Sequence, residues 1–152
     1  MAPVRILLVE DESIVAMDME RRLNTLGYEV IEHVLSGENA VAKAEQEHPD
    51  IILMDIHLKG KMDGIEAAER IKDRLGTPVI YITAYSDENT MALVKVTEPF
   101  GYILKPFQER EIYSYIEKNY MDFFLGQSAD SISVRSILTR ARLIRLMQAS
   151  TN

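Results

Sequence analysis

Val4-Arg5-Ile6-Leu7-Leu8-Val9-Glu10-Asp11-Glu12 is the stretch that decides the fold of this 152-residue chain. It has the pattern of an apolar strand that ends abruptly in three carboxylates. A second apolar run, Ile51-Ile52-Leu53-Met54-Asp55, ends in the same way. In an open α/β sheet, side chains at the carboxyl ends of the strands point into the crevice where ligands bind. The two runs therefore predict a cluster of acids at one edge of a sheet.

Such a cluster predicts a metal site. Crowded carboxylates repel one another and raise some of their own pKa values, unless a hard cation lies among them. The oxygen ligands of Glu10, Asp11 and Asp55 suit Mg²⁺ or Mn²⁺. Asp55 is the best candidate nucleophile, because a carboxylate beside Mg²⁺ can accept a phosphoryl group. Thr83 and Lys105 end the fourth and fifth strands, where they could contact the phosphoryl oxygens.

Short apolar runs alternate with segments of helical period, which indicates βαβ units and a parallel sheet. We expect helices over Ser13–Leu26, from a Ser36 cap to about Glu47, from Asp63 to Leu75, from Ser86 or Asp87 onward, and over Gln108–Tyr120. The expected fold is α/β, a flavodoxin-like doubly wound parallel sheet of five strands in the order 2-1-3-4-5 with five helices. The expected strands are Val4–Val9, Glu29–Leu35, Ile51–Asp55, Val79–Thr83 and Gly101–Leu104.

The composition changes after about Asp122. Residues 126–131 are typical of a linker, and Ser131 or Ser133 can cap a last helix to about Gln148. We therefore expect a domain over residues 3–120, followed by a linker and short helical tail over residues 121–152. Three interpretations of the tail stay open: a dimerisation or docking helix, a poorly ordered end, or a truncated segment.

Charge and composition exclude several classes of function. The net charge is −7, and residues 1–118 hold 13 Lys/Arg against 22 Asp/Glu. This acidic main body argues against non-specific nucleic-acid binding, which needs a basic surface. The absence of cysteine excludes disulfides, thiolate catalysis and cysteine-ligated zinc. No signal peptide is apparent, and no apolar run approaches the roughly 20 residues that cross a bilayer. We expect a cytoplasmic protein that does not enter a membrane.

Five blocks, in order and in spacing, resemble the receiver domain of two-component response regulators, the CheY-like superfamily. The resemblance covers roughly residues 3–120, and its specificity comes from all the blocks lying in register. The blocks are Val9-Glu10-Asp11-Glu12, Leu53-Met54-Asp55-Ile56, Met62-Asp63-Gly64, Tyr81-Ile82-Thr83-Ala84 and Gly101-Tyr102-Ile103-Leu104-Lys105-Pro106-Phe107.

The resemblance implies a role for each acid at the sheet edge. Asp55 is expected to accept a phosphoryl group from a sensor histidine kinase or phosphotransfer protein. Mg²⁺, or Mn²⁺, is expected to be bound by Glu10, Asp11, Asp55 and the backbone carbonyl of Ile56.

It also implies a switch. Lys105 is expected to pair with the phosphoryl group, Thr83 to move toward it, and Tyr102 to turn inward as Thr83 moves. The Lys105–Pro106 peptide is expected to be cis, a state accessible essentially only before proline.

The function implied is that of a phosphorelay switch, not of an enzyme with other substrates: it would catalyse only its own phosphorylation and dephosphorylation. Phosphorylation would change the surface of the fourth helix, fifth strand and fifth helix, which binds an unknown protein target. Direct DNA binding is not expected, and a phosphorylation-dependent homodimer stays open.

The sequence departs from the usual receiver pattern at two places. Glu10 stands where the family most often has aspartate. The loop from Ile56 to Gly64 is one residue longer than the commonest form, with Lys59 where proline is usual. His57, in this loop, and Tyr85 are expected to govern access of the water that hydrolyses the phosphorylated state.

Two alternatives come from other classes of protein. A Mg²⁺-dependent phosphatase or phosphotransferase of haloacid-dehalogenase type also uses a strand-ending Asp, but it would want a second acid where this chain has His57, and a substrate-capping insertion. A flavodoxin-like ligand-binding module shares the fold, but no glycine-rich phosphate loop follows the first strand.

Overall fold

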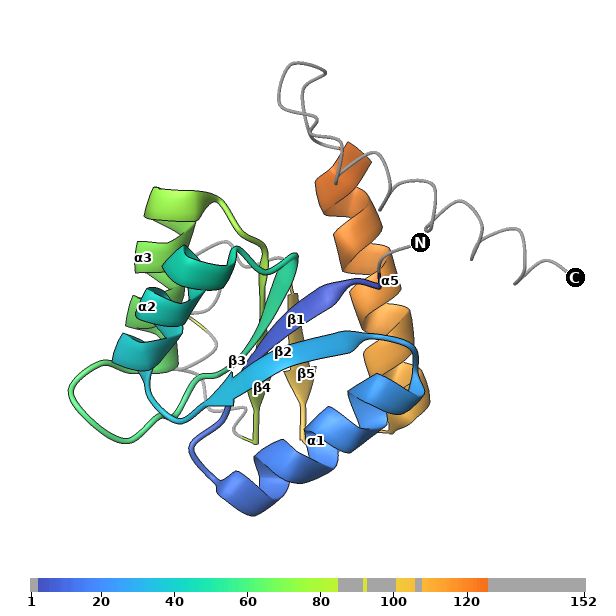
Figure 1. Cartoon of the computed structure of the whole chain (residues 1–152), viewed down its shortest axis with the longest axis horizontal. Coiled ribbons are helices and arrows are strands. Elements are labelled where there is room, and N and C mark those ends of the chain that lie inside the picture. Colours follow the sequence, from blue (N-terminus) through green and yellow to red (C-terminus); the bar gives the residue numbers. More distant parts are fainter. Residues whose placement is uncertain (1–2, 85–91, 93–100, 106–107, 126–152) are drawn as a thin grey trace, which may run out of the picture.

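The computed structural model describes residues 3–84, 92, 101–105 and 108–125 (Figure 1). Several expectations lie outside these residues. They are the fourth helix from Ser86 or Asp87, the role of Tyr85, the cis peptide before Pro106, and the linker and tail helix after residue 125.

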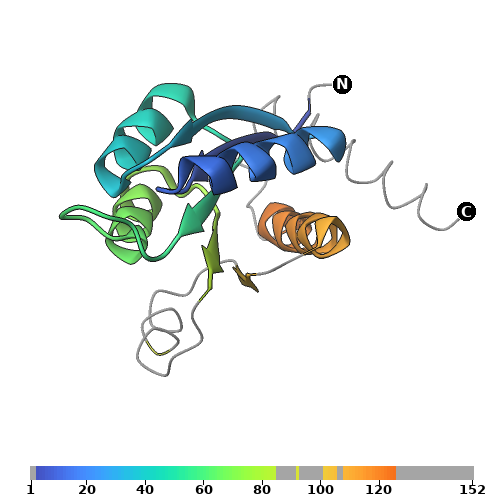
Figure 2. The same ribbon diagram turned by 90° about the horizontal axis from the view of Figure 1, so that it is seen from below.

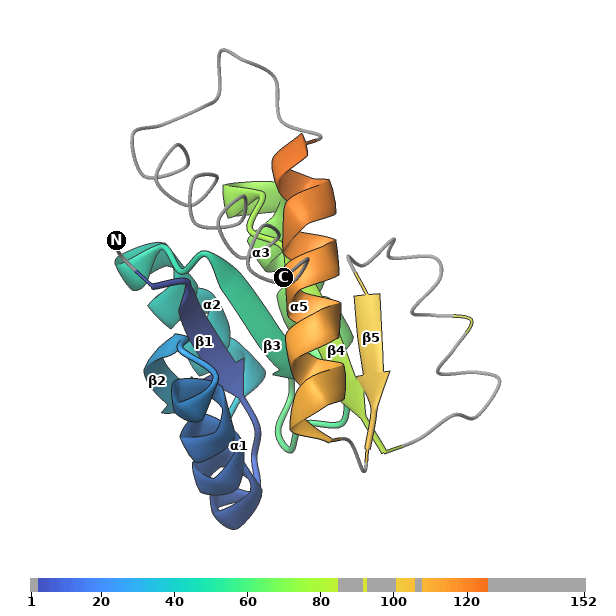
Figure 3. The same ribbon diagram turned by 90° about the vertical axis from the view of Figure 1, so that its right-hand side faces the viewer.

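A parallel five-stranded sheet forms the centre of the fold, in the order β2-β1-β3-β4-β5. The predicted flavodoxin-like topology is therefore confirmed. The arrowheads of the strands point the same way in Figure 3, so the carboxyl ends gather at one edge. The strands are β1 (Arg5–Val9), β2 (Glu29–Val34), β3 (Ile51–Asp55), β4 (Val79–Thr83) and β5 (Gly101–Leu104).

The register of the strands brings the acids together. Val9 at the end of β1 pairs with Met54 of β3, so Glu10 and Asp55 follow adjacent positions on neighbouring strands. Asp55 in turn pairs with Ile82 of β4, one residue before Thr83. All residues of β3 and of β4 are buried, as expected for central strands covered on both faces.

Helices cover both faces of the sheet. In Figure 2, α2 and α3 lie on one side of the strands, and α1 and α5 lie on the other. The predicted caps are present: Ser36 Oγ accepts from the Asn39 N–H at 3.2 Å, and Asp63 Oδ1 accepts from the Glu66 N–H at 2.8 Å. The helices are α1 (Ser13–Thr25), α2 (Gly37–Glu47), α3 (Gly64–Leu75) and α5 (Glu109–Leu125).

The fifth helix is longer than predicted, because it continues past Tyr120 to Leu125. The sequence offers no glycine or proline between Tyr120 and Gly126, so nothing breaks the helix before that point. The helix is held to the rest of the fold by a hydrogen bond from the hydroxyl of Tyr28, which precedes β2, to the Glu117 carboxylate.

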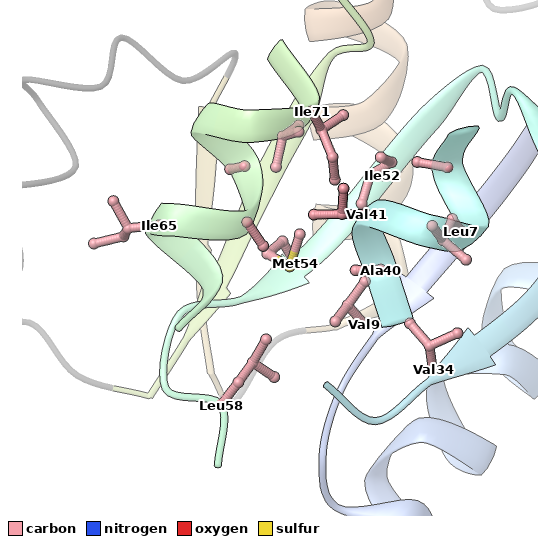
Figure 4. Close-up of a cluster of buried hydrophobic side chains, with 14 of the residues drawn as sticks. Leu7, Val9, Val34, Ala40, Val41, Ile52, Met54, Leu58, Ile65 and Ile71 are labelled. Atoms are coloured by element: carbon pink, nitrogen blue, oxygen red, sulfur yellow. The ribbon is translucent and has the colours of Figure 1, made fainter. Parts of the chain in front are cut away.

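Two apolar clusters, one on each face, hold the helices to the sheet. On one face Leu7, Ile52 and Met54 pack against Val41 of α2 and Ile71 of α3, as Figure 4 shows. On the other, alternate residues of the same strands, such as Ile6, Leu8 and Leu53, pack against α1 and α5. Because alternate side chains of β1 are buried in one cluster or the other, polar side chains emerge at the ends of the strand. None of the helices in the described part of the chain is long and apolar enough to cross a bilayer.

Candidate functional site

Three carboxylates converge at the tips of β1 and β3. Ligand oxygens of Glu10, Asp11 and Asp55 all lie within 4.8 Å of one another. The side chains of Glu10 and Asp55 are buried, whereas Asp11 is half-buried. Carboxylate oxygens at such separations, beside a solvent-accessible pocket, are a ligand set that suits a hard divalent cation retaining several waters. The predicted cluster therefore exists, and its chemistry fits the metal.

Lys105 supplies the positive charge at the site. Its Nζ lies 2.7 Å from Glu10 Oε2 and 3.6 Å from Asp55 Oδ2. The backbone N–H of Lys105 donates to the Thr83 carbonyl at 2.8 Å, which ties the end of β5 to the end of β4. Thr83 itself is fully buried. The fold thus brings Lys105 to Glu10, which is 95 residues away in the sequence.

The electrostatics of the cluster oppose the ionisation of Asp55 when no cation is bound. Burial, together with the charge of Glu10, raises the pKa of Asp55 from its ordinary 3.8 to about 7, although the Lys105 ammonium opposes the rise. Burial works against the charged form of Lys105, but the hydrogen bond to Glu10 and the charge of Asp55 outweigh it and raise the pKa of Lys105. The site therefore has a surplus of acid that a second cation would relieve.

Backbone amides of the loop after β3 orient two of the acids. The N–H of His57 donates to Asp55 Oδ1 at 3.2 Å, and the N–H of Lys59 donates to Asp11 Oδ2 at 3.2 Å. These contacts were not predicted, because any residue type except proline can supply an amide. The signal available in the sequence was Lys59 itself, which provides an N–H where proline would not.

An open pocket of about 420 Å³ gives access to the cluster. Glu12 lies on its wall and stands at the N-cap position of α1, but its side chain makes no capping hydrogen bond. His57 is exposed and also lies on the wall. The lining residues are Asp11, Glu12, Asp55, Ile56, His57, Leu58, Lys59, Asp63, Ile65, Ala84 and Lys105.

Gly64 allows α3 to begin directly against the end of β3. A Cβ at this position would lie 2.0 Å from the carbonyl oxygen of Asp55, closer than any side chain tolerates. The Gly64 N–H donates to the Ile56 carbonyl at 2.9 Å, which fixes this close approach. The glycine therefore sets the backbone position of the candidate phosphoacceptor.

The Ile56 carbonyl, which was predicted to bind the metal, is engaged in backbone hydrogen bonds. This oxygen accepts two backbone hydrogen bonds, from Gly64 at 2.9 Å and from Leu58 at 3.2 Å. These two bonds would compete with a cation for the lone pairs of the oxygen, so its role as a metal ligand stays a prediction. The turn from β3 into α3 directs this peptide toward the helix.

Tyr102, the predicted switch residue, lies on β5 and is 37% exposed. Its backbone N–H, on the outer edge of the sheet, donates to the hydroxyl of Tyr115 on α5 at 2.9 Å. The backbone of Tyr102 is thus tied to α5, and its side chain leaves β5 on the face opposite to that of the buried Ile103. Its movement stays a prediction.

The chain is similar in sequence to response regulators. The family model described as response regulator receiver domain matches residues 6–117. The transcriptional regulatory protein PdtaR of Mycobacterium tuberculosis is 32% identical over 115 residues, which are 76% of this chain and 56% of the relative. The alkaline phosphatase synthesis transcriptional regulatory protein PhoP of Bacillus subtilis is 36% identical over 109 residues, 71% of this chain and 45% of the relative. The chain thus spans about half the length of these curated relatives.

Solved structures show the same fold. The signal receiver domain of a modulated diguanylate cyclase from Desulfovibrio desulfuricans G20 is 35% identical with a TM-score of 0.78, over 84% of this chain and 100% of that one. The receiver domain of a sensor histidine kinase from Pseudomonas aeruginosa PAO1, with magnesium coordinated in its active site cleft, is 31% identical with a TM-score of 0.72, over 79% and 99%. With the match over residues 6–117, these findings place the chain in the response regulator receiver domain family.

Proposed function

We propose that this chain is a phosphorylation-driven signalling switch in which Asp55 accepts a phosphoryl group from a histidine kinase or phosphotransfer protein. The observation that supports it most directly is the position of Asp55, within reach of Glu10, Asp11 and Lys105 at the pocket. A nucleophilic carboxylate needs this environment, because positive charge must balance the phosphoryl oxygens as they approach. A cytoplasmic location belongs to the same proposal.

In the proposed transfer, an Asp55 carboxylate oxygen attacks the phosphorus of a phosphohistidine. The new O–P bond forms as the donor's N–P bond breaks, and the imidazole nitrogen keeps the electron pair and takes up a proton. Lys105 Nζ, now held by Glu10, would turn its hydrogens to a phosphoryl oxygen. The Thr83 hydroxyl would move to another oxygen from the end of β4, beside Asp55.

Mg²⁺ fits this site, and Glu10, Asp11 and Asp55 would hold it. When bound, it would neutralise the acids and polarise the phosphoryl group. The carbonyl of His57 is the better candidate for a backbone ligand, since that of Ile56 is engaged twice and His57 lies on the pocket wall. The chain's own contribution is to keep these oxygens together and Asp55 accessible.

Phosphorylation would then shift a population between two existing arrangements. Its effect is limited by how much better the phosphoryl group fits one arrangement than the other. Movement of Thr83 would draw Tyr102 inward, because the two residues lie on paired strands, where Thr83 pairs with Leu104 and Tyr102 pairs with Tyr81. The exposed face of β5 and α5 would change, and with it the affinity for a protein target. No catalysis beyond the chain's own phosphorylation and dephosphorylation belongs to the proposal.

Labelling by an acyl phosphate tests the central claim. The full chain, incubated with acetyl phosphate and Mg²⁺, should gain one phosphoryl group by intact mass spectrometry, and EDTA should prevent the gain. Asp55→Asn should not be labelled, whereas Asp73→Asn, an exposed acid on α3, should be labelled normally. Mg²⁺-dependent labelling of Asp55→Asn at the wild-type rate would remove Asp55 from its role.

The phosphatase alternative predicts turnover of a small phosphoester such as p-nitrophenyl phosphate. The position two residues after Asp55 holds His57, which is exposed and donates its backbone N–H to Asp55. A second acid at that position would have served as general acid in such an enzyme. The geometry therefore favours the switch.

A further inference from the structure

The loop after β3 is held by three carboxylates from three different parts of the fold. The N–H groups of His57 and Lys59 donate to Asp55 and Asp11, as described above. The N–H of Met62 donates to Oε1 of Glu38, in the first turn of α2, at 3.1 Å. Two of these acids, Asp11 and Asp55, line the pocket, whereas Glu38 belongs to α2 and does not line it. Glu38 is therefore the outer attachment of a segment whose inner attachments are candidate metal ligands.

Close packing supports the same attachment. Leu58 and Met62 of the loop are 8% and 7% exposed and belong to the apolar cluster under α2 and α3, where Figure 4 labels Leu58. A Cβ at Gly37 would lie 2.8 Å from the Met62 carbonyl oxygen, so the start of α2 and the loop are in direct contact. Gly60, with φ at 108°, makes the turn between the two buried residues. The longer loop is thus a closely packed segment that forms one wall of the pocket.

We infer that Glu38 is a positioning residue of the phosphoacceptor site: by holding the Met62 amide, it keeps the loop where its inner amides orient Asp11 and Asp55. Each inner amide occupies one oxygen of its carboxylate and leaves the other to a cation. This inference rests on the proposed function, because it concerns the same Mg²⁺ site. Glu38 itself is not a ligand.

The consequence is a weaker cation site when the attachment is cut. Replacement of groups that orient metal ligands typically costs 10- to 100-fold in affinity. Glu38 acts one step further out, through the loop, so Glu38→Ala should weaken Mg²⁺ binding by about three- to tenfold. The amides of His57 and Lys59 should also exchange with solvent faster, since their partners are no longer held in register.

Two control variants distinguish the positioning effect of Glu38 from the effect of its negative charge and from a general loss of stability. Glu38→Gln keeps an oxygen that can accept from the Met62 N–H but removes the negative charge. Glu45→Ala removes an exposed acid from the same helix, and with it an ion pair to Arg74 at 2.7 Å. It matches the loss of charge and of a surface contact without touching the loop.

The experiment is calorimetric titration of Mg²⁺ into the 152-residue wild-type chain and the three variants, with amide exchange measured by NMR. We expect weaker binding and faster exchange only in Glu38→Ala, with Glu38→Gln and Glu45→Ala near wild type. Equal weakening in Glu38→Ala and Glu38→Gln would show a long-range charge effect and overturn the inference, as would wild-type affinity in Glu38→Ala. A wild type that binds no Mg²⁺ and cannot be labelled at Asp55 would instead overturn the proposed function.

Discussion

Asp55→Asn should make the metal-free protein more stable, and increasingly so as the pH rises. The folded state raises the pKa of Asp55 from 3.8 to about 7, so between these values the folded protein holds a proton that the unfolded chain has released. The free energy of unfolding must then fall as the pH rises through this window and level off above it. Asparagine keeps the shape and the acceptor for the His57 N–H but cannot ionise.

The magnitude follows from the change in proton affinity. At about 1.4 kcal/mol for each tenfold change, a rise from 3.8 to about 7 corresponds to about 4 kcal/mol at high pH. About a third of this free-energy difference between Asp55→Asn and the wild type is already present at pH 5, where the Asp55 carboxyl of the unfolded chain is mostly ionised. The advantage of Asp55→Asn should therefore grow by about 2–3 kcal/mol between pH 5 and pH 8.

Urea denaturation followed by circular dichroism, in EDTA, measures this difference at each pH. Asp73→Asn serves as the control for loss of an exposed carboxylate. Saturating Mg²⁺ should reduce the difference in stability between Asp55→Asn and the wild type, because it stabilises only the wild type. The gain is about 2.7 kcal/mol when the Mg²⁺ concentration is a hundred times its dissociation constant. An advantage of Asp55→Asn that stays constant from pH 5 to pH 8 would refute the reasoning.

Three further substitutions test how the site and its neighbours are built. Lys105→Ala should lower the free energy of unfolding by about 3 kcal/mol at pH 8, because it leaves the Glu10 carboxylate, with a side chain 2% exposed, without its cation. Urea denaturation measures the loss, with Lys105→Met as the comparison that keeps the apolar stem, and a loss of less than 1 kcal/mol would contradict the prediction. Gly64→Ala should cost about 2–3 kcal/mol, since its Cβ would lie 2.0 Å from the Asp55 carbonyl oxygen, and an unchanged melting temperature would argue against that approach. Ser36→Ala should cost about 1 kcal/mol by removing the cap of α2, visible as faster exchange of the Asn39 amide; unchanged exchange would show that the cap contributes little.

The topology could be predicted because local and global signals agree along most of the chain. The runs over β1, β3 and β4 are almost wholly apolar, which only strands covered on both faces require. Caps at Ser36 and Asp63 then mark where two helices begin. The end of α5 was missed, because after Tyr120 the composition changes without a residue that stops a helix. A helix continues until its hydrogen bonding is interrupted, not until its amphipathic pattern weakens.

The acidic side chains of the site could also be predicted from the sequence, since carboxylates at the ends of neighbouring parallel strands must converge. The backbone contacts were not. The two hydrogen bonds to the Ile56 carbonyl depend on the φ and ψ angles of the turn, which residue identity does not specify. The attachment of the Met62 amide to Glu38 joins residues 24 apart whose types have no pairing preference. Sequence patterns identify reactive groups, whereas their orientation is set by amides that every residue but proline carries.

The same electrostatics that weaken the metal-free fold make the site responsive. If protein cations balanced the charge of every acid in the cluster, Mg²⁺ would find no negative charge to neutralise. Phosphorylation of Asp55 would then have to break a stable ion pair. Three carboxylates, Glu10, Asp11 and Asp55, around one lysine leave the cluster formally two positive charges short. A proton on Asp55 relieves part of this deficit, and a divalent cation balances all of it. A phosphoryl group on Asp55 would add negative charge again and compete with Glu10 for Lys105. The backbone N–H of Lys105 donates to the Thr83 carbonyl directly after β5, so we predict that this competition acts on the strand that carries Tyr102.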